Sequence, residues 1–216
     1  MKRIFLFSLF LLLFLTSGFA QRKIRLGFEG GPNYASFSGF SGASDFKPKI
    51  SFTVGVTAEF KLKDRLYLKT GLSFERKRAT NDTYYYIDFN PPFNEWIPIS
   101  AYIQADYLVC PVMTKYEFGK NDPFYMTFGL FAAMTLKSEF FSDDNYSRSN
   151  VFKSTDIGLC FGVGKAFDFG LKNAINIELR ENLGVVNTNK DYSITGGGKV
   201  NTNSFNLICG YSFDIK

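Results

Sequence analysis

The sequence predicts an all-β fold, an eight-stranded antiparallel up-and-down transmembrane β-barrel. Segments of about ten residues alternate apolar and polar side chains with a period of two, the pattern of a strand that faces lipid on one side and a lumen on the other. Short and long connections between these segments also alternate along the chain. Aromatic residues are abundant, with 26 Phe and 12 Tyr in 216 residues. Such rings favour strands and form the aromatic girdles of membrane barrels.

The N-terminal segment, 1–20, has the pattern of a secretory signal peptide. Two basic residues precede an apolar run at 4–15, and Gly18 and Ala20 provide the small residues that a signal peptidase accepts. A membrane anchor is the less favoured alternative, because this run is shorter than the roughly 20 residues that a membrane-spanning helix needs. We therefore expect the segment to be cleaved, which leaves one outer membrane barrel domain over 21–216.

The first three strands form the beginning of the predicted barrel. The first strand, around 23–37, has the weakest pattern because glycines and a proline interrupt it, although Leu26 and Phe28 keep the alternation. The second strand, 50–62, alternates without a break over a membrane-length segment. After a tight turn, the third strand at 66–77 completes a hairpin. Five further strands with the same period are predicted at 108–118, 124–137, 156–164, 175–180 and 204–213.

The connections between these strands fall into two classes that alternate along the chain. The short turns are predicted near 63–65, 119–123 and 170–173. Outer membrane barrels place short turns in the periplasm and long loops outside, so this pattern supports the barrel independently of hydrophobicity. The long polar connections are predicted near 38–48, 79–99, 138–153 and 188–200.

The polar faces of the strands are predicted to point into the barrel. An eight-stranded barrel is only wide enough for side chains to fill it. Charges buried there must pair to offset their desolvation. We therefore expect a closed barrel with a structural salt-bridge network and not an active site. The predicted lumen network comprises Glu59, Lys61, Lys69, Glu75, Lys77, Lys115, Glu117, Asp156, Glu178 and Arg180.

The sequence argues against most common catalytic chemistry. It contains no histidine, which removes Ser-His-Asp triads, Cys-His pairs and the common zinc sites. We expect no catalytic residue, metal or cofactor; a membrane-embedded hydrolase or acyltransferase is the enzyme alternative. Cys110, Cys160 and Cys209 are few and far apart, so they are interpreted as small apolar fillers of strands. The modest net charge of +5 does not indicate a nucleic-acid partner.

The predicted loop at 79–99 is unusually rich in rings for a segment that faces water. Clusters of this kind bind sugars or partner proteins. The alternative is that the rings form the outer girdle and a cap over the barrel. The candidate recognition residues are Tyr84, Tyr85, Tyr86, Phe89, Phe93 and Trp96.

The segment Tyr107–Tyr116, which overlaps the fourth predicted strand, resembles the Tyr-Leu-x-x-Pro-Leu-Leu-x-Lys-Tyr strand of the PorT-like outer membrane β-barrel proteins of the Bacteroidota. Arg180 with Gly184 is similar to that family's seventh strand, and 210–213 to its closing strand. Val109 departs from the pattern, because the family often has an inward Glu there. The resemblance implies an integral outer membrane barrel and, from the founding member, an accessory part in type IX secretion of cargo.

These observations predict a monomer in the outer membrane of a Gram-negative bacterium. The expected partners are outer membrane lipid and, through the resemblance, components of envelope secretion. The alternative is a periplasmic lipocalin-like barrel that binds a ligand. A lipocalin-like barrel places its apolar face inside and its polar face outside, so the direction of the apolar face separates the two hypotheses.

Overall fold

The computed structural model describes residues 24–40, 42–89, 93–119, 123–142, 146–169, 172–190 and 198–215, and within them the side chains of 83–89, 93–99, Tyr146 and Phe169 are not described. The predicted signal peptide, 1–20, therefore lies outside the described residues. In the described part of the chain, no helix has the length and apolar character needed to cross a membrane.

The described residues form nine strands and one short 3-10 helix. All neighbouring strands pair in an antiparallel manner. The elements are β1 (Ile24–Ser38), η1 (Ala43–Asp45), β2 (Lys47–Lys63), β3 (Leu66–Phe89), β4 (Phe93–Phe118), β5 (Phe124–Ser142), β6 (Tyr146–Ser149), β7 (Thr155–Phe169), β8 (Asn173–Gly184) and β9 (Asn201–Asp214).

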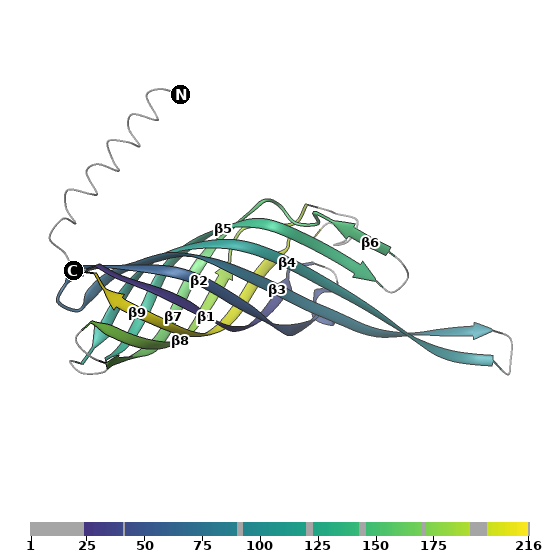
Figure 1. The fold of residues 1–216 in the computed structure, drawn as a ribbon. Helices are drawn as coiled ribbons and strands as arrows, with labels where there is room; N and C mark the ends of the chain where they lie inside the picture. Colours follow the sequence, from purple (N-terminus) through teal and green to yellow (C-terminus); the bar gives the residue numbers. More distant parts are fainter. Residues whose placement is uncertain are drawn as a thin grey trace, which may run out of the picture.

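Eight of the described strands close into a ring in the order β1, β2, β3, β4, β5, β7, β8 and β9, with β9 returning to β1 (Figure 1). This confirms the predicted eight-stranded up-and-down barrel. The remaining strand, β6, was not predicted; it pairs only with the far end of β5, from Glu139↔Ser149 to Ser142↔Tyr146.

The two ends of the barrel differ in their connections. The short turns after β2, β4 and β7 lie at the end where the chain terminates, which we name the turn end (Figure 1). The opposite end, which carries η1, β6 and the far ends of β3 and β4, is the loop end. The alternation of short and long connections follows the prediction for most of the chain.

The prediction of a loop at 79–99 is wrong, because β3 extends to Phe89, β4 begins at Phe93, and the two strands pair with each other. Their register runs without a shift from Thr80↔Tyr102 to Phe89↔Phe93, beyond the last pair of β3 with β2, Lys47↔Thr80. The segment is rich in Tyr, Ile, Phe and Trp, which favour strands, and each arm supplies the hydrogen-bond partners of the other. We name the paired segments 81–89 and 93–100 the hairpin extension.

The two faces of the barrel wall have opposite character. On β2, Val54 and Val56 point outward and are about half exposed, at 53% and 50%, whereas Thr53 and Glu59 point inward and are buried. Outward side chains on the other barrel strands are likewise mostly apolar, and most inward ones are polar or charged. This is the arrangement predicted for a barrel surrounded by lipid, and it is the reverse of a lipocalin-like barrel.

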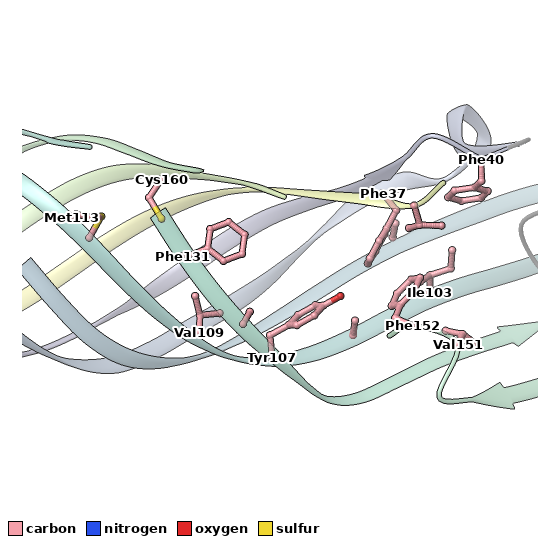
Figure 2. Packing of buried hydrophobic residues seen from close by; sticks show 14 residues of the cluster. Phe37, Phe40, Ile103, Tyr107, Val109, Met113, Phe131, Val151, Phe152 and Cys160 are labelled. Atoms are coloured by element: carbon pink, nitrogen blue, oxygen red, sulfur yellow. The ribbon is translucent and has the colours of Figure 1, made fainter. Parts of the chain in front are cut away.

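Buried apolar side chains extend along the lumen from the level of Met113, which pairs with Lys69 in the register, to the loop end (Figure 2). Within the cluster, the rings of Phe37 and Phe152 stack with centroids 5.2 Å apart. Val109, which stands where the resemblance expects an inward Glu, points inward and is buried. The larger members of this apolar cluster are Phe37, Phe40, Ile103, Tyr107, Val109, Met113, Phe131, Val151, Phe152, Cys160 and Val200.

Candidate functional site

The inward charges of the barrel form three groups that follow one another from the turn end towards the apolar cluster. They come from inward positions of strands that are far apart in the sequence. We name them the turn-end cluster (Arg25, Glu59, Lys115, Glu117 and Asp214), the middle cluster (Glu29, Lys69, Glu178 and Arg180) and the upper cluster (Glu75, Lys77 and Asp156).

The middle cluster is a compact set of two cations and two carboxylates. The Arg180 guanidinium donates to both carboxylates, with Nη1 2.8 Å from Glu29 Oε1 and Nε 2.8 Å from Glu178 Oε1. Lys69 Nζ lies 2.8 Å from Glu178 Oε2 and 3.2 Å from Glu29 Oε2. Because every charge has two opposite partners, the mutual attraction offsets the cost of burying the four groups.

Polar and small neighbours complete the middle cluster. The Tyr125 hydroxyl donates to Glu178 Oε2 at 3.2 Å, and the Thr127 hydroxyl donates to Glu178 Oε1 at 3.2 Å. Gly162 on β7 leaves room for these groups, because a Cβ at this position would lie 2.6 Å from Glu178 Oε1. The glycine is therefore needed for the close approach of the carboxylate to the neighbouring strand β7.

The turn-end cluster is held by cations between carboxylates. Lys115 Nζ lies 3.0 Å from Glu59 Oε2 and 3.1 Å from Glu117 Oε1. Arg25 Nε bonds Asp214 at 2.9 Å, and its Nη1 lies 3.7 Å from both glutamates. The Lys115 ammonium also lies 4.4 Å from the centroid of a neighbouring ring, that of Tyr125, so it has an electrostatic partner on each side.

The upper cluster is less completely neutralised. Lys77 Nζ donates to the Thr202 hydroxyl at 2.8 Å but lies 3.9 Å from Asp156 Oδ2. That hydroxyl donates in turn to Asp156 Oδ2 at 2.6 Å. Glu75 accepts hydrogen bonds from two neutral side chains, Asn182 at 3.1 Å and the hydroxyl of Ser204.

The structure brings together all but one of the residues predicted for the lumen network. Lys61 is the exception: it is half buried and makes no ion pair with any residue that the structure describes. It lies beside the turn, paired with Tyr67 in the register, where its long side chain extends towards water.

Sequence reasoning missed three charged members: Asp214, which follows the predicted last strand, and Arg25 and Glu29, which come from the interrupted first strand. The alternation of Leu26 and Phe28 in that strand places both charges on the inward face, so the signal was present. The neutral hydrogen-bond partners of the upper cluster are Thr202, Asn182 and Ser204. They could not be recognised from the sequence, because inward hydroxyl and amide groups are common in the strands.

The remaining candidate residues give a mixed outcome. Cys160 is buried in the lumen, Cys110 and Cys209 are exposed on the outer face, and all three are free thiols. The side chains of Tyr84, Tyr85, Tyr86, Phe89, Phe93 and Trp96 lie outside the described residues, so their role in recognition stays a prediction. Within the described part of the chain, no three His, Cys, Asp or Glu side chains gather as a metal site would require.

Polar side chains from opposite sides of the barrel contact each other across the lumen. β3 and β8 stand four places apart in the ring of eight, and so on opposite sides of the barrel. Lys69 on β3 nevertheless bonds Glu178 on β8 at 2.8 Å, and Glu75 on β3 accepts from Asn182 on β8 at 3.1 Å. Two direct contacts therefore cross the full width of the lumen.

Comparison with known proteins places this architecture in a family. The family model for the outer membrane protein beta-barrel domain matches residues 19–206. No curated protein sequence matches the chain significantly.

Among solved structures, the chain is similar to the attachment invasion locus protein Ail of Yersinia pestis, with 13% identity, coverage of 88% of this chain and 98% of that one, and a TM-score of 0.44. It is similar to OprG from Pseudomonas aeruginosa, with 14% identity, coverage of 90% and 97%, and a TM-score of 0.47. It is also similar to the outer membrane protease OmpT from Escherichia coli, with 8% identity, coverage of 89% and 97%, and a TM-score of 0.46.

Proposed function

This chain belongs to the outer membrane protein beta-barrel domain family, and from that membership we propose that it is a non-enzymatic outer membrane barrel with a closed lumen that recognises partners at its loop end. The turn end then faces the periplasm and the loop end faces outward, as in other outer membrane barrels. The periplasmic lipocalin-like alternative is not favoured, because the apolar face points outward.

The observation that carries the closed lumen is the pair of contacts between opposite walls. Lys69 and Glu178 meet across the lumen, and their side chains are 5% and 1% exposed. The apolar cluster then fills the lumen beyond them, with Phe131 and Phe152 buried. A barrel filled in this way supports the proposal that it conducts no ions.

Planar-bilayer recording of the purified protein tests the closed lumen. We expect the natural protein to show no stable open channel. The double variant Lys69→Ala with Glu178→Ala removes one contact between opposite walls, and we expect it to leak small ions more often than the outward control Val56→Ala. A reproducible conductance of the natural protein would overturn the proposal.

The proposed recognition surface is the hairpin extension, whose sequence carries the ring-rich stretch. Replacing 84–98 with a two-residue turn keeps every pair of β3 with β2 and of β4 with β5. We expect the shortened protein to assemble normally, since surface projections tolerate change better than barrel strands. Loss of assembly, measured by the gel mobility of unheated samples, would show that the extension is structural.

The finer role rests on the resemblance to the PorT-like proteins of the Bacteroidota, and it is an accessory part in type IX secretion. Deleting the gene and measuring export of type IX cargo tests this role; unchanged export would contradict it.

N-terminal sequencing of the protein from the outer membrane tests the predicted signal peptide, with Gln21 expected as the first residue. Turnover of lipid or peptide substrates by the purified protein would favour the enzyme alternative.

A further inference from the structure

One carboxylate lies on the outer face of the barrel, within the apolar belt. Glu181 on β8 pairs in register with Phe161 on β7 and with Phe205 on β9, and both rings are outward, at 39% and 46% exposed. Along its own strand, the outward residues on either side are Leu179 and Leu183, which are also exposed. Glu181 therefore has apolar outward neighbours on β7, β8 and β9, while the polar side chain of Asn203, the next outward residue of β9 towards the loop end, borders it on that side.

Glu181 has no counter-ion among the residues that the structure describes. Its described polar contact is the side-chain amide of Asn203, which donates to Oε1 at 3.1 Å. Three other outward charges are compensated within the protein: Arg76 bonds Asp106 at 2.8 Å, and Lys165 lies over two phenylalanine rings at 5.0 and 4.9 Å. No described residue of the chain therefore supplies a positive charge to Glu181.

A groove on the outer wall adjoins this carboxylate. Its volume is about 610 Å³, and it crosses β4, β5, β7, β8 and β9. Volumes of about 300–1,000 Å³, with an apolar lining and a few polar groups, are typical of sites for small molecules. The groove is lined by the side chains of Tyr116, Met126, Phe128, Val163 and Leu179, with Glu181 among them.

A carboxylate against hydrocarbon is costly unless it is paired, and an ionisable residue within a membrane segment marks a binding or functional site. We propose that the groove and Glu181 form a site for a membrane lipid with a primary amine headgroup. The acyl chain lies along the apolar lining, and the ammonium donates a charge-assisted hydrogen bond to Glu181. This inference rests on the outer membrane location and not on the closed lumen or on recognition at the loop end.

Native mass spectrometry of the full mature protein, released from detergent micelles, tests the proposal. The probes are phosphatidylethanolamine and phosphatidylcholine with the same acyl chains, since both are zwitterionic but only the first has N–H donors. We expect the natural protein to retain phosphatidylethanolamine preferentially. Glu181→Gln should lower this preference by about fivefold, the factor that corresponds to losing the extra strength of a charge-assisted hydrogen bond.

Two further variants separate the headgroup from the groove. Glu139→Gln, an outward carboxylate that Lys137 pairs at 2.9 Å, is the matched control and should leave the preference unchanged. Val163→Trp fills the groove and should lower retention of both lipids while the ratio between them stays the same. Each variant is first checked for the heat-sensitive gel mobility of a folded barrel.

Equal retention of the two lipids by the natural protein would overturn the proposal, as would an unchanged preference in Glu181→Gln. A dimer that depends on Glu181, in place of retained lipid, would also overturn it. A conductance or a secretion phenotype bears on the proposed function alone, so the two failures are distinguishable.

Discussion

The middle and upper clusters lie inside the same barrel, but their buried charges are compensated by different kinds of partner. In the middle cluster, Lys69 and Arg180 each contact both carboxylates, with N–O distances of 2.8 to 3.2 Å. In the upper cluster, Lys77 lies 3.9 Å from Asp156, and Glu75 is held by neutral donors. One cluster is electrically balanced, whereas the other has two carboxylates for one ammonium.

The difference shows that an inward position does not decide how a charge is compensated. Lys77 lies next to the apolar cluster, where its ammonium stands 5.0 Å from the ring centroid of Tyr107 and 5.7 Å from that of Phe131. These rings supply part of the attraction that a second carboxylate supplies to Lys69. Asp156 Oδ1, by contrast, is buried and accepts no hydrogen bond within the described residues.

The largest expected effect is the removal of the cation that balances the middle cluster. Arg180→Met leaves Glu29 and Glu178 buried with Lys69 as their remaining partner, and it should lower the free energy of unfolding by about 3–5 kcal/mol. Lys77→Met in the upper cluster should cost clearly less. Denaturant titration in lipid vesicles compares the two variants, and equal losses would show that the clusters do not differ in strength.

The second prediction tests the assignment of faces on which the comparison depends. Val56→Lys places an ammonium against lipid and should cost about 2–4 kcal/mol of unfolding free energy. Thr57→Lys points into the lumen near the carboxylate of Glu59, so pairing should offset part of its cost. The same titration, with gel mobility of unheated samples, measures both. If Thr57→Lys were the more damaging, the two faces would be exchanged.

A third pair of variants removes one carboxylate charge from each cluster. Glu178→Gln weakens bonds to two cations and should cost about 1.5–3 kcal/mol, the range for hydrogen bonds to charged groups. Glu75→Gln loses bonds from neutral donors and should cost about 1 kcal/mol. Thermal unfolding in the same vesicles ranks the two variants. A reversed order would mean that Glu75 has a stronger partner than its described contacts indicate.

The smallest effect is expected for the weakest ion pair. Asp156→Asn removes a charge whose ammonium partner lies 3.9 Å away, while the hydrogen bond from Thr202 can remain. Replacing an incompletely satisfied buried charge is often neutral or stabilising, so we expect a change within about 1 kcal/mol of zero. A loss comparable to that of Glu178→Gln would show that the long pair is as strong as the short ones.

The sequence predicted the barrel wall well because each strand has two different surroundings. On β2 and β5, lipid on one side and packed polar groups on the other keep the period of two over 50–62 and 124–136. The same reasoning failed at 79–99, where β3 and β4 leave their outer neighbours and pair only with each other. Beyond the barrel the two faces no longer differ in this way, so the alternation disappears while the strands continue.

The partners within the lumen could not be predicted, because they depend on the stagger of the closed ring. Lys69 and Glu178 are 109 residues apart in the sequence, and their contact follows from the position of β3 opposite β8. Alternation alone gives the inward direction of each side chain and not its height in the barrel. Lys61 shows the same limit, because it points inward from a position too close to the turn to meet the network.

The pairing of β1 with β9 has a consequence for the order of folding. This seam runs from Arg25↔Asp214 to Ser38↔Asn201, and it joins residues such as Arg25 and Asp214 that are 189 positions apart. Contacts of such high sequence separation form late, because the whole intervening chain must be arranged first. Until then, both terminal strands would present unpaired backbone groups to lipid. We therefore expect the seam to form last, after the other strands have paired.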